Sequence, residues 1–188
     1  MHGKVYKREF LDKYNITFCA ESSYMDEDVG FNRTCRLFTN FYYIDEPIIK
    51  WIQDSNSLTY KDNRVVLYKD QTRALSLNAI HTIETCRKNN IDPTTEINQI
   101  AVSLYYWFLK TVTERSEYIV DAWNGAKIFY QYFKDEIDLN NLLLGNPELR
   151  RCFPFRTKIH FPINVLKFAK EMWREEIIPD YYLTFNKN

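Results

Sequence analysis

With 188 residues, the chain is long enough to form one compact domain with its own hydrophobic core. Apolar residues make up 45% of the sequence and aromatic residues 16%, which excludes an intrinsically disordered chain. The 25 basic residues balance the 25 acidic residues, so no overall positive charge attracts nucleic acid or an anionic membrane, and any such affinity requires a local patch.

The first seventy residues are predicted to combine short helices with strands. Residues 7–14 (KREFLDKY) and 46–54 (EPIIKWIQD) favour helices, and Pro47 suits the first turn of the second one. Residues 16–22 (ITFCAES) favour a strand. This part of the chain is therefore predicted to be mixed α/β.

A β-hairpin is expected where this part ends. Residues 57–60 (SLTY) and 64–70 (RVVLYKD) are short segments of strand-forming residues, and Lys61-Asp62-Asn63 between them is typical of a turn. From residue 71 onward, apolar residues recur at intervals of three and four, which indicates helices.

The rest of the chain is predicted to be mainly helical, with one late strand. Asp92 followed by Pro93 is typical of a helix start, and Pro162 suits the start of the last helix. Residues 153–162 (FPFRTKIHFP) alternate between polar and apolar side chains, which predicts the strand. The expected helices are residues 72–90, 94–115, 116–136, 138–144, 147–153 and 163–176.

The expected fold class is α+β. A mainly helical body (71–188) is joined to a small N-terminal part (1–70) that contains the β-hairpin, and the body includes the late strand. No linker-like segment divides the chain, so a single domain (1–188) is expected. Residues 98–112 are apolar nearly all round, which predicts the central buried helix; an aromatic face that binds a partner is the alternative.

The late strand contains the main candidate binding site. Arg156, Lys158 and His160 fall on one face of it, while aromatic and aliphatic residues alternate with them. Arg150 and Arg151 precede the strand, so these five residues form a candidate site for phosphates or for an acidic partner. The same alternation also fits the exposed face of an ordinary core strand, whose charges discourage edge pairing.

Catalytic motifs are not found. The four glycines are too dispersed for a dinucleotide-binding turn or a phosphate-binding loop, which need several glycines close together. His81 follows the core-facing Ile80 in a predicted helix and is interpreted as a flanking residue rather than a catalytic base. We therefore expect no cofactor and lean towards a protein that is not an enzyme.

An acidic cluster offers the alternative to that expectation. Glu21, Asp26 and Asp28 could supply oxygen ligands for Mg²⁺, which would make the chain a metal-dependent enzyme. The segment SYMDEDVG also reads as an acidic turn that ends at Gly30.

Location is inferred from the cysteines and from the apolar runs. Cys19, Cys35, Cys86 and Cys152 are far apart, which argues against a zinc site and suits reduced thiols. The longest apolar stretch, residues 100–109, is too short to span a bilayer. We expect a cytoplasmic protein without membrane contact.

Its abundant Asn, Ile, Lys, Tyr and Phe have AT-rich codons, which suggests a phage or another AT-rich mobile element.

Two short segments resemble known families. Residues 9–22 (EFLDKYNITFCAES) are similar to a segment of bacterial family-10 fucosyltransferases, and residues 79–93 (AIHTIETCRKNNIDP) to a helix-turn stretch of insertion-sequence transposases. The catalytic segments of both families are missing from the chain, so no functional residue is assigned from either resemblance.

Together these features predict a small intracellular binding protein without catalysis: a regulator, inhibitor or accessory subunit of a larger protein or nucleic-acid machine. Another protein is the expected partner, and nucleic acid could bind through the local basic patch. The alternative is a metal-dependent enzyme acting on nucleic acid, of the nuclease or transposase kind. A third hypothesis is an assembly protein that self-associates through its aromatic helix.

Overall fold

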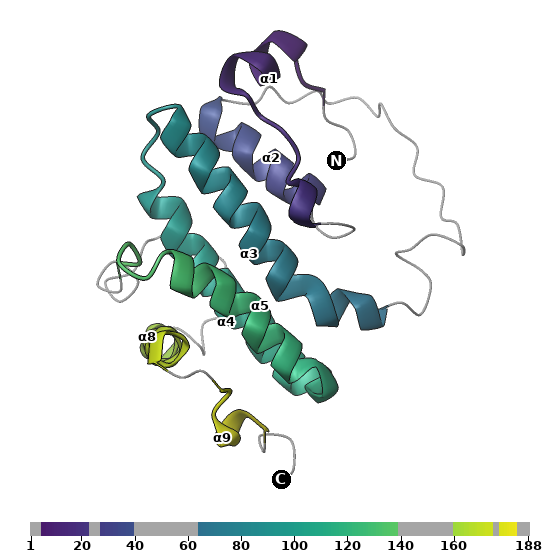
Figure 1. Ribbon diagram of the computed structural model, residues 1–188, viewed down its shortest axis with the longest axis vertical. Helices are drawn as coiled ribbons and strands as arrows, with labels where there is room; N and C mark the ends of the chain where they lie inside the picture. Colours follow the sequence, from purple (N-terminus) through teal and green to yellow (C-terminus); the bar gives the residue numbers. More distant parts are fainter. Residues whose placement is uncertain (1–4, 23–26, 40–63, 139–159, 175–176, 184–188) are drawn as a thin grey trace.

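The computed structural model describes residues 5–22, 27–39, 64–138, 160–174 and 177–183, and these form a helical bundle (Figure 1). The α-helices are α1 (Arg8–Tyr14), α2 (Glu27–Phe38), α3 (Arg64–Lys88), α4 (Thr94–Glu114), α5 (Ile119–Tyr132), α8 (His160–Arg174) and α9 (Asp180–Leu183). Two short 3₁₀ turns accompany them, η1 (Ala20–Ser22) and η2 (Ser116–Tyr118).

The predicted α+β fold class is wrong, because the described residues contain helices and no strand. Residues 64–70, expected as the second strand of the hairpin, form the first two turns of α3. In the segment predicted as an early strand, residues 16–19 have no regular secondary structure and Ala20–Ser22 form η1. β-propensity is weak and needs a paired neighbour, whereas the helix that contains residues 71–88 extends back without a break to residue 64.

The late strand is wrong for a different reason. Its last residues, His160 to Pro162, form the first turn of α8. Proline is tolerated there because the first backbone N–H groups of a helix have no partner within the helix. The helix thus begins two residues before the proline that was expected to start it. Residues 153–159, which make up the rest of the predicted strand, lie outside the described residues, as do 46–54 and 57–60.

Helix α3 is the centre of the bundle and contacts α2, α4 and α5 (Figure 1). Its contact with α5 is close because Gly125 has no side chain: a Cβ there would lie 2.5 Å from the backbone nitrogen of Arg73. Thr72 and Ser76 donate hydrogen bonds to the α5 carbonyls of Ala122 and Gly125, at 2.9 and 2.7 Å. Small polar residues on α3 therefore replace the usual aliphatic side chains at this helix pair.

On its other side, α3 packs against α2. Gly30 brings the two helices together, since a Cβ at this position would lie 2.5 Å from Oδ1 of Asn78. The hydroxyls of Thr34 and Thr82 form a buried hydrogen bond of 2.8 Å across the same interface. The outer face of α2 is covered by a small cluster around Phe31, on which the ring of Phe18 stacks at 4.3 Å.

The main core lies between α4, α5 and α8, and it is strongly aromatic. Phe168 of α8 contacts Tyr105 and Phe108 of α4 and Trp123 and Tyr130 of α5. In Figure 1, α8 is seen nearly end-on, so it crosses the direction of α4 and α5. This arrangement buries one face of α8 and exposes the other.

Helix α4 begins at Thr94 and ends at Glu114, and its N-cap is Pro93, one residue after Asp92, which was expected at that position. Oδ1 of Asp92 accepts hydrogen bonds from the backbone N–H and the hydroxyl of Thr94, which lower the pKa of Asp92. Most of its apolar side chains are buried, although Tyr106 is 46% exposed. No helix in the described part of the chain combines the length and the apolar character needed to cross a bilayer.

Candidate functional site

The predicted basic site lies mostly outside the described residues. Arg150, Arg151, Arg156 and Lys158 belong to the segment 139–159, and His160 is the first residue of α8. The alternation that placed three of these side chains on one strand face therefore ends inside a helix. This basic site therefore remains a prediction. The described element that follows it directly in the sequence is α8.

The exposed face of α8 carries basic residues, as the segment 139–159 before it does. Val165, Phe168, Ala169 and Met172 are buried against the core, whereas Lys167, Lys170 and Arg174 are exposed. Spacings of three and four residues place these three cations on one side of the helix. Lys167 lies 3.9 Å from Glu171, a carboxylate that also accepts a hydrogen bond from the Tyr182 hydroxyl. We call Lys167, Lys170 and Arg174 the α8 basic face.

The acidic residues proposed as metal ligands are not brought together in the described structure. Glu21 lies in η1, where hydrogen bonds from its own backbone N–H and from Sγ of Cys19 lower its pKa. Asp28 is half-buried in the first turn of α2, and Asp26 lies outside the described residues. Within the described ranges, no group of three His, Cys, Asp or Glu side chains could hold a metal ion.

His81 has a structural contact that fits its interpretation as a flanking residue. Its Nε2 atom lies 3.0 Å from the carbonyl oxygen and 3.2 Å from the hydroxyl of Thr17. Just after the end of α3, Nδ2 of Asn89 donates to the carbonyl of Tyr14 at 3.0 Å. His81 and Asn89 thus hold the end of α1 and the residues that follow it against the bundle.

A cluster of aromatic and cationic side chains lies where the start of α3 meets the end of α4. The ammonium of Lys110 lies 4.7 Å from the centre of the Trp107 ring and 5.8 Å from that of Tyr68. The Tyr68 hydroxyl donates to Glu114, and the guanidinium of Arg115 lies 6.0 Å from the Tyr68 ring. The cations of this cluster thus contact aromatic rings of the same chain, with the carboxylate of Glu114 beside them.

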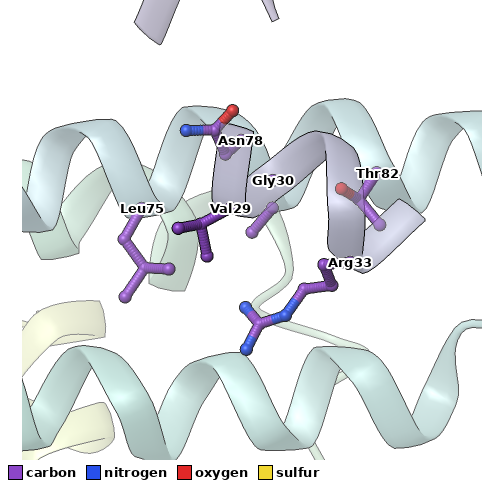
Figure 2. A pocket seen from close by; sticks show the side chains of 7 residues that line it. Val29, Gly30, Arg33, Leu75, Asn78 and Thr82 are labelled. Atoms are coloured by element: carbon purple, nitrogen blue, oxygen red, sulfur yellow. The ribbon is translucent and has the colours of Figure 1, made fainter. Parts of the chain in front are cut away.

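A cleft separates α2 from α3 near their closest contact (Figure 2). It is narrow, with room for about one water molecule. Figure 2 shows the Arg33 side chain extending from α2 toward a neighbouring helix. The lining residues are Val29, Gly30 and Arg33 of α2 and Leu75, Asn78, Ala79 and Thr82 of α3.

Behind this cleft, Arg33 pairs with a buried carboxylate. Its Nε atom lies 2.9 Å from Oε1 of Glu96, in the first turn of α4, and the Glu96 side chain is only 6% exposed. Burial raises the pKa of Glu96, although the charges of Arg33 and Arg36 lower it in part. Burial, together with the negative charge of Glu96, also raises the pKa of Cys86 to about 11.

Sequence reasoning missed this pair. An acidic residue in the first turn of a helix is ordinarily exposed, where it interacts favourably with the helix dipole, and Glu96 has that position. No feature of the sequence separates it from such residues. Its burial depends on the tertiary structure, which brings it beside Arg33, a residue more than sixty positions earlier in the chain.

Comparisons with known proteins found no matching protein-family model, no matching curated protein and no matching solved structure. The two short similarities to fucosyltransferases and transposases therefore do not extend to a family match.

Proposed function

We propose that the chain is a binding protein without catalysis, which engages the acidic surface of another protein through the α8 basic face. The observation that carries this proposal is that Lys167, Lys170 and Arg174 line one exposed side of a helix whose other side is anchored in the aromatic core. An anchored helix holds its charges in a fixed pattern, which favours recognition of a complementary surface.

Basic residues in the sequence before α8 also support a binding site for an acidic partner in this part of the chain. Arg150, Arg151, Arg156 and Lys158 precede α8 within a short distance along the chain. Positive charges in this part of the chain would accelerate encounters with an acidic partner. Since the chain has no net charge, we favour a protein partner over nucleic acid, which usually requires a wide positive surface. A cytoplasmic regulator, inhibitor or accessory subunit is the role we infer.

Reversing two charges of the α8 basic face tests the proposal. In Lys170→Glu/Arg174→Glu, both side chains are exposed, so the fold should be retained while binding of the partner weakens about tenfold or more. The measurement is a quantitative pull-down from the native cell with mass spectrometry, followed by a binding titration with the protein that is captured. Circular dichroism checks that the variant is folded.

The matched control is Lys69→Glu/Arg73→Glu on α3, which changes the same number of exposed charges at the same spacing. Its binding should equal that of the unchanged protein. If both double variants captured the partner equally well, the α8 basic face would not be the binding site. Capture of nucleic acid in place of protein, with a steep dependence on salt, would replace the proposed partner class. No observation among the described residues favours the metal-dependent alternative, so a second function is not proposed.

A further inference from the structure

Residues 177–183, which follow α8, are anchored in the aromatic core. The ring of Tyr182, in α9, lies 4.9 Å from that of Phe108, between ring centres. Ile178 and Tyr182 are buried in the main core. The Tyr182 hydroxyl also donates a hydrogen bond of 3.0 Å to Oε2 of Glu171, on α8. A four-residue helix is unstable by itself, so these contacts are what fix the segment against the bundle.

Two apolar side chains of this anchored segment are exposed to solvent. Ile177 is 79% exposed and Leu183 is 42% exposed. Single exposed apolar residues are common, but these two occur within seven residues, in a segment that the core holds in place. Because the segment is already ordered, a partner that buries both side chains gains apolar contact at a low cost in conformational entropy. We call Ile177 and Leu183 the α9 apolar pair.

The α9 apolar pair lies close to the α8 basic face (Figure 1). Ile177 follows Arg174 by three residues, and three extended residues span no more than about 11 Å. At the other end of the pair, the hydroxyl of Tyr182 and the ammonium of Lys167 lie 3.0 and 3.9 Å from the carboxylate oxygens of Glu171. A typical protein interface covers about 800 Å² on each partner, a patch roughly 30 Å across. One partner can therefore contact the α8 basic face and the α9 apolar pair together.

Charge and apolar character are divided between the two helices. The α8 basic face carries three cations, which attract carboxylates. In residues 177–183 the only charged residue is Asp180, which is exposed and repels carboxylates. The carboxylates of a partner should therefore lie against α8, and its apolar side chains against α9. An amphipathic helix has this arrangement, because its charged and apolar residues lie on different sides.

We propose that the α8 basic face and the α9 apolar pair form one surface, which binds an acidic amphipathic helix of a partner protein. This inference rests on the proposed function, to which it adds the apolar half of the surface and the kind of partner segment that fits it. Charge alone would accept any acidic surface. The apolar pair restricts binding to acidic partners that also present apolar side chains.

Fluorescence anisotropy with the full chain and two labelled peptides tests this surface. In the first peptide, leucines recur at intervals of three and four residues among glutamates, and in the second each leucine is replaced by glutamine. The two peptides have the same charge and similar helix propensity, so their difference in affinity reports the apolar contact. We expect the leucine peptide to bind about tenfold more tightly. Ile177→Ser/Leu183→Ser should remove this difference and leave binding of the glutamine peptide unchanged.

The matched control is Val5→Ser/Val29→Ser, which also replaces two exposed apolar side chains. Val5 precedes α1 and Val29 belongs to α2, and both of these helices lie well away from α8 and α9 (Figure 1). The control should bind both peptides as the unchanged protein does. Circular dichroism checks that each variant is folded.

Equal affinity of the unchanged protein for the two peptides overturns the inference, and so does a full preference for the leucine peptide in Ile177→Ser/Leu183→Ser. In either case the proposed function stands if Lys170→Glu/Arg174→Glu still weakens binding of both peptides. If that charge-reversed variant binds both peptides as the unchanged protein does, or if neither peptide binds the unchanged protein, the proposed function and this inference are both wrong.

Discussion

Replacement of Gly125 by alanine is expected to lower the free energy of unfolding by about 3 kcal/mol, at the upper end of overpacking effects. The new Cβ would lie 2.4 Å from Oγ1 of Thr72 and 2.5 Å from the backbone nitrogen of Arg73. Because one of these obstacles is backbone, α3 and α5 must separate. Separation weakens the buried hydrogen bonds from Thr72 and Ser76 to α5, and this loss exceeds the gain of about 1 kcal/mol in helix propensity.

Urea unfolding followed by circular dichroism measures this effect. Asn124→Ala is the control, since the neighbouring side chain is exposed on the same helix and its replacement should change stability by no more than about 0.5 kcal/mol. If Gly125→Ala were as stable as the unchanged protein, the close contact between α3 and α5 would not exist as described. Gly125→Val should be more destabilising than Gly125→Ala, because a larger side chain forces the helices further apart.

The second large effect is expected at the buried ion pair. Arg33→Met should lower the free energy of unfolding by about 3 kcal/mol at neutral pH, because it leaves the Glu96 carboxylate buried without its partner. Adding Glu96→Gln to this variant should restore most of the loss, since the amide carries no charge that requires compensation. The interaction energy from the two single variants and the double variant should be at least about 2 kcal/mol.

The effect of pH on Arg33→Met distinguishes this explanation from simple loss of packing. The pKa of Glu96 in the folded protein is already raised above its ordinary value of 4.5, and removing the Arg33 charge raises it further. A carboxyl whose pKa is higher in the folded state binds its proton more tightly there, so falling pH stabilises the folded state. The deficit of Arg33→Met should therefore be full above the folded-state pKa of Glu96 and shrink as pH falls through it.

Urea unfolding at several pH values between about 5 and 8 measures this change. In the Glu96→Gln background, where position 96 does not titrate, the stability difference made by Arg33→Met should lose that pH dependence. A deficit of constant size at every pH would show that Arg33 stabilises the protein through packing of its hydrocarbon chain and not through its charge.

Helices with a clear apolar period and a clear start signal were predictable from the sequence. The predicted helix 94–115 matches α4 within one residue, because Asp92 and Pro93 mark its start and its apolar pattern continues to its end. The short helix at 7–14 matches α1, which begins one residue later. In both segments, the local pattern and the packing favour the same structure.

The predicted strands failed where local preference and packing disagree. Val65, Val66 and Tyr68 favour a strand by propensity, but they lie in the first turns of α3, whose following residues pack on α5. The sequence cannot show this, since the contact depends on Gly125, more than fifty positions away. Gly125 itself reads as a weak point in a predicted helix, whereas in the fold it permits the contact.

From the sequence alone it could be inferred that the chain folds, that its charges balance and that its body is mainly helical. The sequence also shows that basic residues gather after residue 149. Composition and periodicity are local properties, so they can be read without the fold. Only the tertiary structure decided that the chain is helical throughout its described part, that Lys167, Lys170 and Arg174 share an exposed face, and that Glu96 is buried against Arg33. Each of these depends on which helix covers which side chain, and that depends on contacts between residues distant in sequence.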